Sequence, residues 1–452
     1  MSRILITVFT FILTVAVLAI LLDKNPSAVD LGGNTEKYKG IVDGSRPFTL
    51  TSAQNKKFKG FKDFLLKKER EDSIKTKNKQ PKVATDQFIR AAFYTPWTGS
   101  TSAPALQKQG DKLNMVFPEW FFVDTMNTVK LQTRIDSAGL AVMRKQNLRI
   151  VPMLTNFNSS KTKFDGHLVH AILNDPQKQQ QFIQSIIDTL TFYQLAGINI
   201  DFEELIETGN DPLSVFQKNL YRQLHAKNLL VTQDIAAFNS DYDLAELGKY
   251  NDYIILMAYD QYNNGTLPGP VSDQKWIEQA LDNAADKIPG NKIILGFAGY
   301  GYDWAEYRDE DGLLQRSIED ITYAQAVDRA KLSGAVIDYD NNSYNLHYSY
   351  EEERTVDNTN RGIKIKHTVW FTDAATAFNI LRFADEYGIA GTVLWRLGSE
   401  DPRLWTFYHR ELSNIALEQT PFDFRLLMSI PINPNQRPTS VGEGELLNIL
   451  YT

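Results

Sequence analysis

Short apolar or alternating segments recur along the chain and are separated by amphipathic helical patterns. The eight segments are 88–94, 115–123, 148–155, 196–203, 229–235, 253–259, 292–298 and 391–395. Strands that alternate with helices belong to a parallel sheet, because parallel neighbours need a long crossover connection. Eight such units predict an α/β fold, a (β/α)8 TIM barrel with extra loops. A doubly wound open sheet is the alternative that this pattern leaves open.

Two Asp-Pro pairs are predicted to begin the helices on either side of the fourth strand. Asp175-Pro176 and Asp211-Pro212 each combine an N-cap residue with a proline that suits the first helical turn. Further helical patterns cover 128–146, 276–287 and 373–387. The fourth strand is therefore expected to have helices before and after it, as a barrel strand does.

The fourth strand places polar residues on one face and apolar residues on the other. Its sequence, Ala-Gly-Ile-Asn-Ile-Asp-Phe-Glu over 196–203, alternates with period two, so Asn199, Asp201 and Glu203 share a face. In an ordinary half-buried strand that face would be solvated. In a parallel sheet both faces are usually covered, and buried carboxylates without partners are costly. We therefore expect this face to line a functional cavity.

Several other predicted strands end in residues suited to sugar binding, and the C-terminal strand ends of a barrel carry its chemistry. An aromatic ring offers a flat apolar face and polar edges, which match the CH-rich face of a pyranose. The predicted substrate-binding residues are Tyr94, Trp97, Glu119, Trp120, Asn156, Asp260, Tyr300 and Trp395.

The segment 196–203 resembles the signature Asp-Gly-x-x-x-Asp-x-Glu of glycoside hydrolase family 18, the chitinase-like barrels. Met257-Ala258-Tyr259-Asp260 and Trp395 are similar to the sixth and eighth strands of that family. Segments 92–94, 118–120, 299–304 and 395–402 resemble a bacterial branch in which the barrel is joined to polysaccharide deacetylase and family 2 glycosyltransferase modules. The resemblance covers about residues 86–415.

This resemblance implies a substrate-assisted retaining glycosidase that cleaves a β-linked N-acetylglucosamine-containing polysaccharide. The catalytic residues that it implies are Glu203 as the acid, Asp201 beside the acetamido group, and Tyr259 on the acetamido carbonyl. Trp395 would form the floor under the sugar. The polymer would be chitin, peptidoglycan or an exopolysaccharide.

The residues themselves agree with an acid at Glu203. Two carboxylates at i and i+2 on one strand face lie roughly 6 to 7 Å apart. In a partly desolvated cavity, the charge of Asp201 is expected to raise the pKa of Glu203 and keep it protonated. The alternative is a conventional pair of Glu203 with Glu119, Asp260 or Glu400.

Two positions depart from the family signature. Ala196 stands where its first aspartate is expected, and Asn199 replaces the aspartate two residues before Asp201. The inner carboxylates of the signature tune the charge beside the acid. These departures favour the alternative function, a non-hydrolytic module that binds or guides a polysaccharide beside the machinery that synthesises or deacetylates it.

The N-terminal region predicts a membrane anchor and a linker. Residues 4–22 carry no charge, are long enough to cross a bilayer and follow Arg3, so 1–22 is predicted to be a transmembrane signal anchor. A cleaved signal peptide is the alternative, although no small-x-small site follows Leu22. Residues 23–85 are polar and Lys-rich and predict a linker. The barrel would then lie outside the cytoplasm, on the periplasmic or extracellular face.

The barrel itself is predicted to span 86–420. Residues 303–369 interrupt the alternation of strands and helices. They predict a small α+β insertion between the seventh and eighth strands, forming one wall of the groove. Residues 421–452 contain three prolines and end in a strand-like segment, which predicts a connection to a further module. A tail that packs back on the barrel is the alternative.

Composition excludes several other chemistries. The chain has no cysteine, so disulfides, thiol nucleophiles and cysteine metal sites are excluded. The pair His167 and His170 lacks an accompanying carboxylate set, and no phosphate loop or dinucleotide fingerprint is present, so no metal and no cofactor is expected. A net charge of −7 argues against a nucleic-acid partner.

Overall fold

The structure is a computed structural model that describes most of the chain after residue 87. The described residues are 88–97, 99–123, 131–206, 211–309, 311–340, 342–355, 362–412 and 414–420, together with Phe422 and Leu427. The predicted anchor at 1–22 and the predicted linker at 23–85 lie outside these residues, as does nearly all of 421–452. Within the described part, no helix is both long and apolar enough to cross a bilayer.

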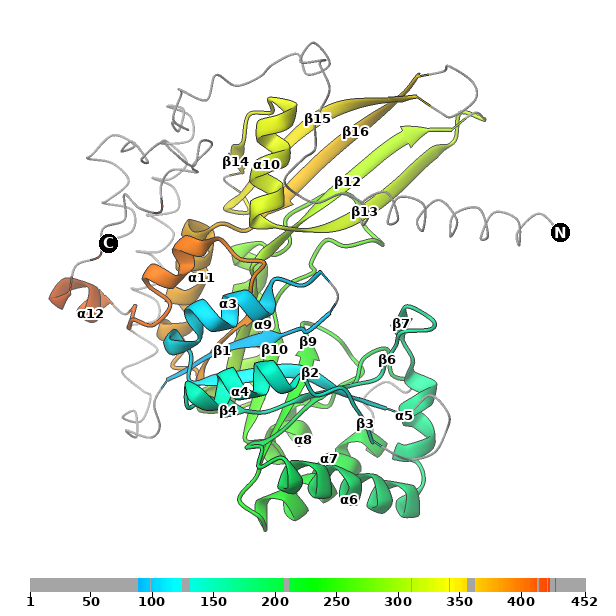
Figure 1. The fold of residues 1–452 in the computed structure, drawn as a ribbon, viewed down its shortest axis with the longest axis vertical. Helices are drawn as coiled ribbons and strands as arrows, with labels where there is room; N and C mark the ends of the chain where they lie inside the picture. The colour runs from blue at the N-terminus through cyan, green and yellow to red at the C-terminus, as the bar shows by residue number, and fades with distance from the viewer. Residues whose placement is uncertain are drawn as a thin grey trace.

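Parallel strands form a closed barrel in the described part of the chain (Figure 1). They are β1 (Ile89–Tyr94), β2 (Met115–Val123), β5 (Met153–Thr155), β8 (Gly197–Asp201), β9 (Leu230–Ala236), β10 (Tyr253–Met257), β11 (Ile293–Ala298) and β17 (Gly391–Trp395). The ring closes because β1 pairs in parallel with both β2 and β17. The predicted eight-stranded barrel is confirmed, and the alternative open sheet is excluded.

The helices of the barrel follow the predicted alternation. They are α3 (Ser102–Gln109), α4 (Ser137–Lys145), α5 (Gly166–Leu173), α6 (Pro176–Phe192), α7 (Asp211–His225), α8 (Leu244–Lys249), α9 (Gln274–Ala285), α11 (Ala374–Glu386) and α12 (Asn414–Gln419), with short 3-10 helices at 110–112, 290–292 and 402–406. Asp175 caps α6, because its carboxylate accepts the backbone N–H groups of Gln177 and Lys178.

Two sequence-based boundaries are wrong. The predicted helix at 128–146 begins only at Ser137, where the Asp136 carboxylate accepts the N–H groups of the first turn. Residues before it form β3 (Leu131–Thr133), which pairs antiparallel with the end of β2. The predicted third strand is divided into β4 (Arg149–Ile150) and β5, because Pro152 has no N–H to give to a ladder.

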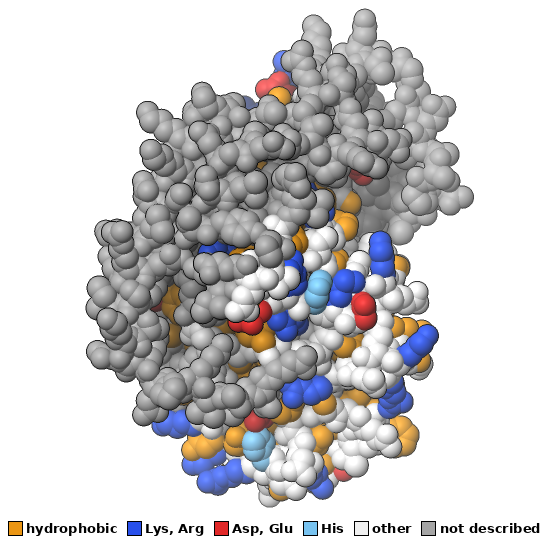
Figure 2. Space-filling view, turned by 90° about the vertical axis from the view of Figure 1, so that its left-hand side faces the viewer, with side chains coloured by type: hydrophobic (Ala, Val, Ile, Leu, Met, Phe, Trp, Pro, Cys, Tyr) orange, Lys and Arg blue, Asp and Glu red, His pale blue; other side chains and the backbone are white. Residues whose placement is uncertain are grey.

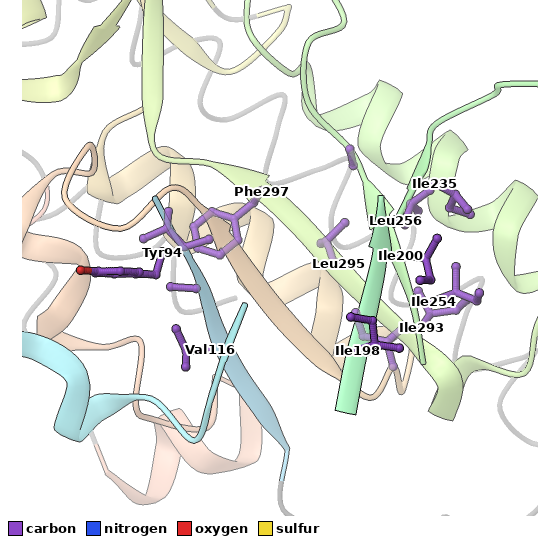
Figure 3. Close-up of a cluster of buried hydrophobic side chains, with 14 of the residues drawn as sticks. Tyr94, Val116, Ile198, Ile200, Ile235, Ile254, Leu256, Ile293, Leu295 and Phe297 are labelled. Atoms are coloured by element: carbon purple, nitrogen blue, oxygen red, sulfur yellow. The ribbon is translucent and has the colours of Figure 1, made fainter. Parts of the chain in front are cut away.

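Apolar side chains fill the barrel on both sides of its wall. The interior contains Ile89, Ala91, Phe93, Met115, Phe117, Val151, Met153, Ile255, Ile294 and Val393. Alternate residues, among them Ile198, Ile200 and Ile235, point outward to the helices (Figure 3). The wall is therefore packed on both faces, and polar residues on its inner face are found where the strands approach their C-terminal ends.

The insertion is a five-stranded antiparallel sheet with one helix, and it extends from one end of the barrel (Figure 1). Its elements are β12 (Tyr300–Arg308), β13 (Leu314–Thr322), α10 (Tyr323–Ser333), β14 (Asp338–Asp340), β15 (Asn345–Thr355) and β16 (Gly362–Phe371). It lies between β11 and β17, as predicted, and begins and ends slightly outside 303–369. Thr322 and Gln325 form a capping box at the start of α10.

A partly buried arginine connects the insertion to the barrel. Arg403 forms ion pairs with Asp401 at 2.5 Å and Asp373 at 3.8 Å, and donates a hydrogen bond to the Tyr323 hydroxyl at 3.1 Å. Asp373 precedes α11 of the barrel, whereas Tyr323 begins α10 of the insertion. One guanidinium group thus contacts both the barrel and the insertion.

The outer surface carries a mixture of side chains. On the described part of the face in Figure 2, basic, acidic and apolar side chains are interspersed. This mixture is usual for a protein surface. The carboxylates at the strand ends, described next, are far more concentrated.

Candidate active site

A cavity of about 1260 Å³ opens at the C-terminal ends of the barrel strands. Its walls include six carboxyl side chains, which lie on strands or in the loops that follow them: Glu119, Asp136, Asp201, Glu203, Asp234 and Asp260. Aromatic side chains complete the walls, including Phe93, Tyr94, Trp97, Tyr259 and Trp395. The cavity therefore combines acid–base groups with flat apolar faces, as the sequence predicts.

Asp201 is the last residue of β8 and is almost completely buried. Burial raises the pKa of Asp201 to about 6, although hydrogen bonds from the Thr155 hydroxyl and from Glu203 act in the opposite direction. Both hydrogen bonds favour the ionised form of Asp201. The group is therefore an anion at neutral pH.

Glu203 lies two residues beyond Asp201 and is partly exposed to the cavity. Burial raises its pKa well above the ordinary range, and the negative charges of Asp201 and Asp260 add to this effect. Its carboxyl group is hydrogen-bonded to Asp201. The raised pKa of Glu203 favours its protonated form beside Asp201, which is the arrangement needed for a general acid next to a negative charge.

Asn156 holds the backbone of Glu203 from the neighbouring strand end. Its Oδ1 accepts the Glu203 N–H at 3.0 Å, and its Nδ2 donates to the Glu203 carbonyl at 2.8 Å. Asn156 itself is completely buried and does not line the cavity. The next residue, Glu204, has a left-handed backbone with φ 49°, which turns the chain away from the strand. Asn156, which the sequence predicts to bind sugar, thus holds the backbone of Glu203 in this structure.

Asp234, on β9, is a cavity residue that the sequence reasoning missed. Its Oδ2 accepts a hydrogen bond from Asn199 Nδ2 at 2.5 Å, and the Thr232 hydroxyl donates to Asn199 Oδ1 at 2.6 Å. Burial, followed by the charge of Asp201, raises the pKa of Asp234 well above the ordinary range. The alternation of Thr232 and Asp234 along the predicted strand 229–235 was the signal that could have found it.

Tyr259 and Trp395 lie on the opposite side of the site, after β10 and at the end of β17. Their rings are stacked, with centroids 6.3 Å apart and an angle of 22°. The Tyr259 hydroxyl is buried and has no hydrogen-bond partner among the described residues. Trp395 is partly exposed and rests edge-on against Phe93 in the barrel interior. A free hydroxyl and an accessible ring therefore face the cavity from neighbouring positions.

Asp260 is held by two tyrosines of the insertion. The hydroxyls of Tyr300 and Tyr302 both donate to its Oδ1, the latter at 2.7 Å. Tyr300 is almost completely buried and lies outside the cavity lining, so in this structure it contacts Asp260 where a sugar contact was predicted. Asp260 has a left-handed backbone with φ 60°.

Glu119 and Trp97 form a polar contact at the far wall. The Trp97 indole N–H donates to Glu119, and Trp97 is 44% exposed, which places it at the rim. Burial raises the pKa of Glu119 to about 7, partly opposed by this hydrogen bond. Arg396 lies over the Trp97 ring at 4.7 Å. Trp97 and Glu119 thus both line the cavity, and their role in sugar binding stays a prediction.

Two other residues weighed from the sequence lie away from the cavity. Trp120 is completely buried, contacts the Tyr94 ring edge-on and does not line the cavity. Glu400 accepts hydrogen bonds from the Trp405 indole and the Gly398 N–H, also outside the lining. The described residues contain no group of three or more His, Cys, Asp or Glu side chains that could hold a metal.

A (β/α)8 barrel with an acid–carboxylate pair and aromatic walls at its strand ends defines a glycoside hydrolase. Comparison with known proteins agrees: the family model of glycosyl hydrolases family 18 matches residues 89–401, and the chain belongs to this family.

The curated relatives are named as glycosylases or lytic enzymes. The chain is 26% identical over 275 residues to the "uncharacterized glycosylase" YvbX of Bacillus subtilis, covering 59% of this chain and 76% of YvbX. It is 25% identical over 299 residues to the cortical fragment-lytic enzyme of Bacillus anthracis, covering 64% of this chain and 66% of that enzyme.

Two crystal structures share the fold. A chitinase from Chromobacterium violaceum has a TM-score of 0.60 at 24% identity, covering 71% of this chain and 97% of the chitinase. The spore cortex-lytic enzyme SleL of Bacillus cereus has a TM-score of 0.61 at 22% identity, covering 72% and 74%. The predicted family is confirmed, while the likeness to the branch with deacetylase and glycosyltransferase modules stays a prediction.

Proposed function

We propose that this glycoside hydrolase cleaves a β-linked N-acetylglucosamine-containing polysaccharide by a substrate-assisted retaining mechanism. The observation that carries the proposal is the hydrogen-bonded pair of Glu203 and Asp201 in the cavity, where burial and the charge of Asp201 raise the pKa of Glu203 well above its ordinary range. A protonated acid is what a glycosidic leaving group requires.

In the first step, Glu203 gives its proton to the glycosidic oxygen while the carbonyl oxygen of the substrate acetamido group attacks the anomeric carbon. The glycosidic bond breaks and a cyclic oxazolinium ion forms. Asp201 faces the acetamido nitrogen and stabilises its positive charge, and the unpartnered Tyr259 hydroxyl donates to the acetamido oxygen. Trp395 supports the apolar face of the sugar.

In the second step, Glu203 works in reverse as a base. It takes a proton from water as the water oxygen bonds to the anomeric carbon, the oxazolinium ring opens, and the acetamido group is restored. The new hydroxyl lies on the face that the leaving group occupied. Atoms and charge balance, and Glu203 regains its proton for the next cycle.

A conventional pair of two catalytic carboxylates is less well supported. Asp260 is engaged by two tyrosine hydroxyls, and Glu119 is engaged by Trp97. Glu400 lies outside the cavity lining. Asp201, in contrast, is directly hydrogen-bonded to the acid.

The class of polymer is proposed from the site and from the relatives. Stacked aromatic rings and an acetamido-binding pair suit chitin, peptidoglycan or a poly-N-acetylglucosamine exopolysaccharide, and the printed names of the relatives include chitinase and cortex-lytic enzymes. These polymers lie outside the cytoplasm, where the anchor predicted at 1–22 would hold the barrel. Deacetylase and glycosyltransferase modules are proposed partners on the sequence resemblance alone.

The full chain should be incubated with β-1,4- and β-1,6-linked N-acetylglucosamine oligomers and with the same oligomers after complete de-N-acetylation. Substrate assistance requires the acetamido oxygen, so only the acetylated oligomers are expected to be cleaved, with the β-anomer of the new reducing end appearing first by NMR. Equal cleavage of the de-N-acetylated oligomers, or an α-anomer as the first product, would overturn the mechanism.

A further inference from the structure

The inner end of the active-site cavity contains a carboxyl–amide pair that the mechanism above does not use. Asp234 and Asn199 belong to adjacent parallel strands, and their side chains meet at 2.5 Å. Asp234 is 1% exposed and Asn199 is completely buried. A buried carboxyl group without a cation needs a reason, because burial of a charge is costly.

The strand register places Asp234 beside Asp201. Asn199 pairs with Thr232 and Ile200 pairs with Gln233, so the next step of the same register brings Asp201 level with Asp234. Neighbouring strands lie about 4.8 Å apart, and residues in register point to the same side of the wall. Both carboxyl groups line the cavity. Two ionised groups at this spacing would repel each other strongly.

The hydrogen bonds of Asn199 fix which atom faces Asp234. Its Oδ1 accepts from the Thr232 hydroxyl at 2.6 Å, so its Nδ2 is turned to Asp234 Oδ2. The other oxygen of Asp234, Oδ1, is buried and has no partner among the described residues. One oxygen is thus satisfied as an acceptor, and the other is available to carry a proton.

The groups that face Asp234 supply no positive charge. The neighbours that raise the pKa of Asp234 are Asp201 and Glu203 at the end of β8. Tyr242 after β9 and Tyr259 after β10 also lie close enough to interact electrostatically with Asp234. All are acids or phenols. Burial and the charge of Asp201 raise the pKa of Asp234 well above its ordinary value.

We propose that Asp234 is a positioning residue whose neutral carboxyl group, held by Asn199, keeps the negative charge of the Asp201–Asp234 pair on Asp201. The inference rests on the proposed function, because Asp201 is the group that meets the acetamido nitrogen. It also gives a reason for Asn199: the amide holds Asp234 by a neutral hydrogen bond, whereas a second carboxyl at this contact would bring a further charge beside Asp201.

The test is the pH dependence of kcat/KM for the full chain and for Asn199→Asp, Asp234→Asn and the exchanged double variant Asn199→Asp/Asp234→Asn. Asn199→Asp adds a carboxyl group beside Asp234, so the acid limb is expected to rise by about 1 pH unit and kcat/KM at pH 6 to fall about fivefold. The double variant restores one carboxyl and one amide. Its acid limb is expected to return to within about 0.3 unit of the native value.

Asp234→Asn alone tests the charge state, because an amide imitates a neutral carboxyl group. Its acid limb is expected to stay within about 0.3 unit of the native one. A downward shift of about 0.5 unit or more would show that Asp234 is ionised and would overturn the inference. So would an unmoved limb in Asn199→Asp, or a double variant no better than Asn199→Asp. Ser240→Asp, on the exposed loop after β9, is the matched control for an added charge.

Failure of the proposed function can be separated from failure of this inference. A native chain that cleaves none of the oligomers contradicts the function, and thermal unfolding then decides the inference. When folding raises the pKa of a buried carboxyl group, the protein loses stability as pH rises. Asn199→Asp is expected to lose Tm relative to the native chain increasingly between about pH 5 and pH 8, and the double variant to regain it. A pH-independent Tm difference would overturn the inference.

Discussion

Asn156 holds the peptide backbone of Glu203 by two hydrogen bonds, one from the Glu203 N–H to Oδ1 at 3.0 Å and one from Nδ2 to the Glu203 carbonyl at 2.8 Å. The acid lies beyond the last residue of β8, where no strand pairing holds it. The buried amide of Asn156 replaces that pairing. The position of the catalytic proton therefore depends on a residue that does not touch the cavity.

Replacing Asn156 with alanine is expected to damage both stability and rate. Loss of two buried hydrogen bonds should lower the free energy of unfolding by about 1–3 kcal/mol. A displaced acid should lower kcat by about 10- to 100-fold. Chemical denaturation and steady-state kinetics measure the two effects, with Asn264→Ala on the exposed loop after β10 as the control. An unchanged kcat would show that Glu203 keeps its position without these two hydrogen bonds.

The pH dependence of kcat/KM should be bell-shaped. Asp201 must be ionised, and burial raises its pKa to about 6, so activity is lost as pH falls through about 6. Glu203 must be protonated, and its pKa is raised well above the ordinary range, so activity is lost only on the alkaline side. Initial rates from about pH 4 to pH 9 give both limbs. An acid limb near pH 4, the ordinary range of aspartate, would contradict the described environment of Asp201.

Trp395→Ala should weaken sugar binding by about 1–3 kcal/mol, by analogy with the stacking of other flat groups on aromatic rings. The ring is partly exposed and stacked against Tyr259. Its loss therefore removes a stacking surface for the sugar and leaves the apolar cluster between the strands and the helices intact. Calorimetric titration with an N-acetylglucosamine oligomer measures the affinity. Leu314→Ala, on the exposed hairpin of the insertion, is expected to change nothing. Native affinity in Trp395→Ala would place the sugar elsewhere.

Arg403→Met should destabilise the protein by about 3–5 kcal/mol, because removing one member of a buried ion pair leaves the other charges uncompensated. The side chains of Asp401 and Asp373 are only 2% and 7% exposed, so water cannot replace the guanidinium group. Denaturant unfolding measures the change, with the exposed Arg308→Met as the control. A loss below about 1 kcal/mol would show that the insertion is held mainly by apolar contacts.

The barrel could be predicted from the sequence because its strands are packed on both sides. Apolar residues at alternate positions, such as Ile198 and Ile200, make the period visible, and the last strand was predicted with the same bounds that the structure shows, 391–395. The helix at 128–146 could not be delimited, since the pairing of Leu131–Thr133 with β2 depends on tertiary contacts. Local periodicity does not report such contacts.

The site was predicted less completely, and the reason is the direction of side chains. Glu119 and Trp120 are neighbours on one strand, so they face opposite sides, and only Glu119 lines the cavity. Thr155 and Asn156 are also neighbours, and only Thr155 lines the cavity. Tyr259 and Asp260 both reach the cavity because β10 ends at Met257 and the alternation stops there. Asp234 was missed because no family motif drew attention to its strand.

The catalytic role of Glu203 is tested by comparing hydrolysis by the native chain, Glu203→Gln and Glu204→Gln. Each is incubated with chitin oligomers, peptidoglycan and poly-N-acetylglucosamine, and the products are identified by mass spectrometry. If Glu203 is the catalytic acid, we expect defined fragments from one of these polymers, a loss of at least about a hundredfold in Glu203→Gln, and native cleavage in Glu204→Gln, whose side chain is exposed. Intact polymers with the native chain, or equal cleavage by Glu203→Gln, would contradict this role.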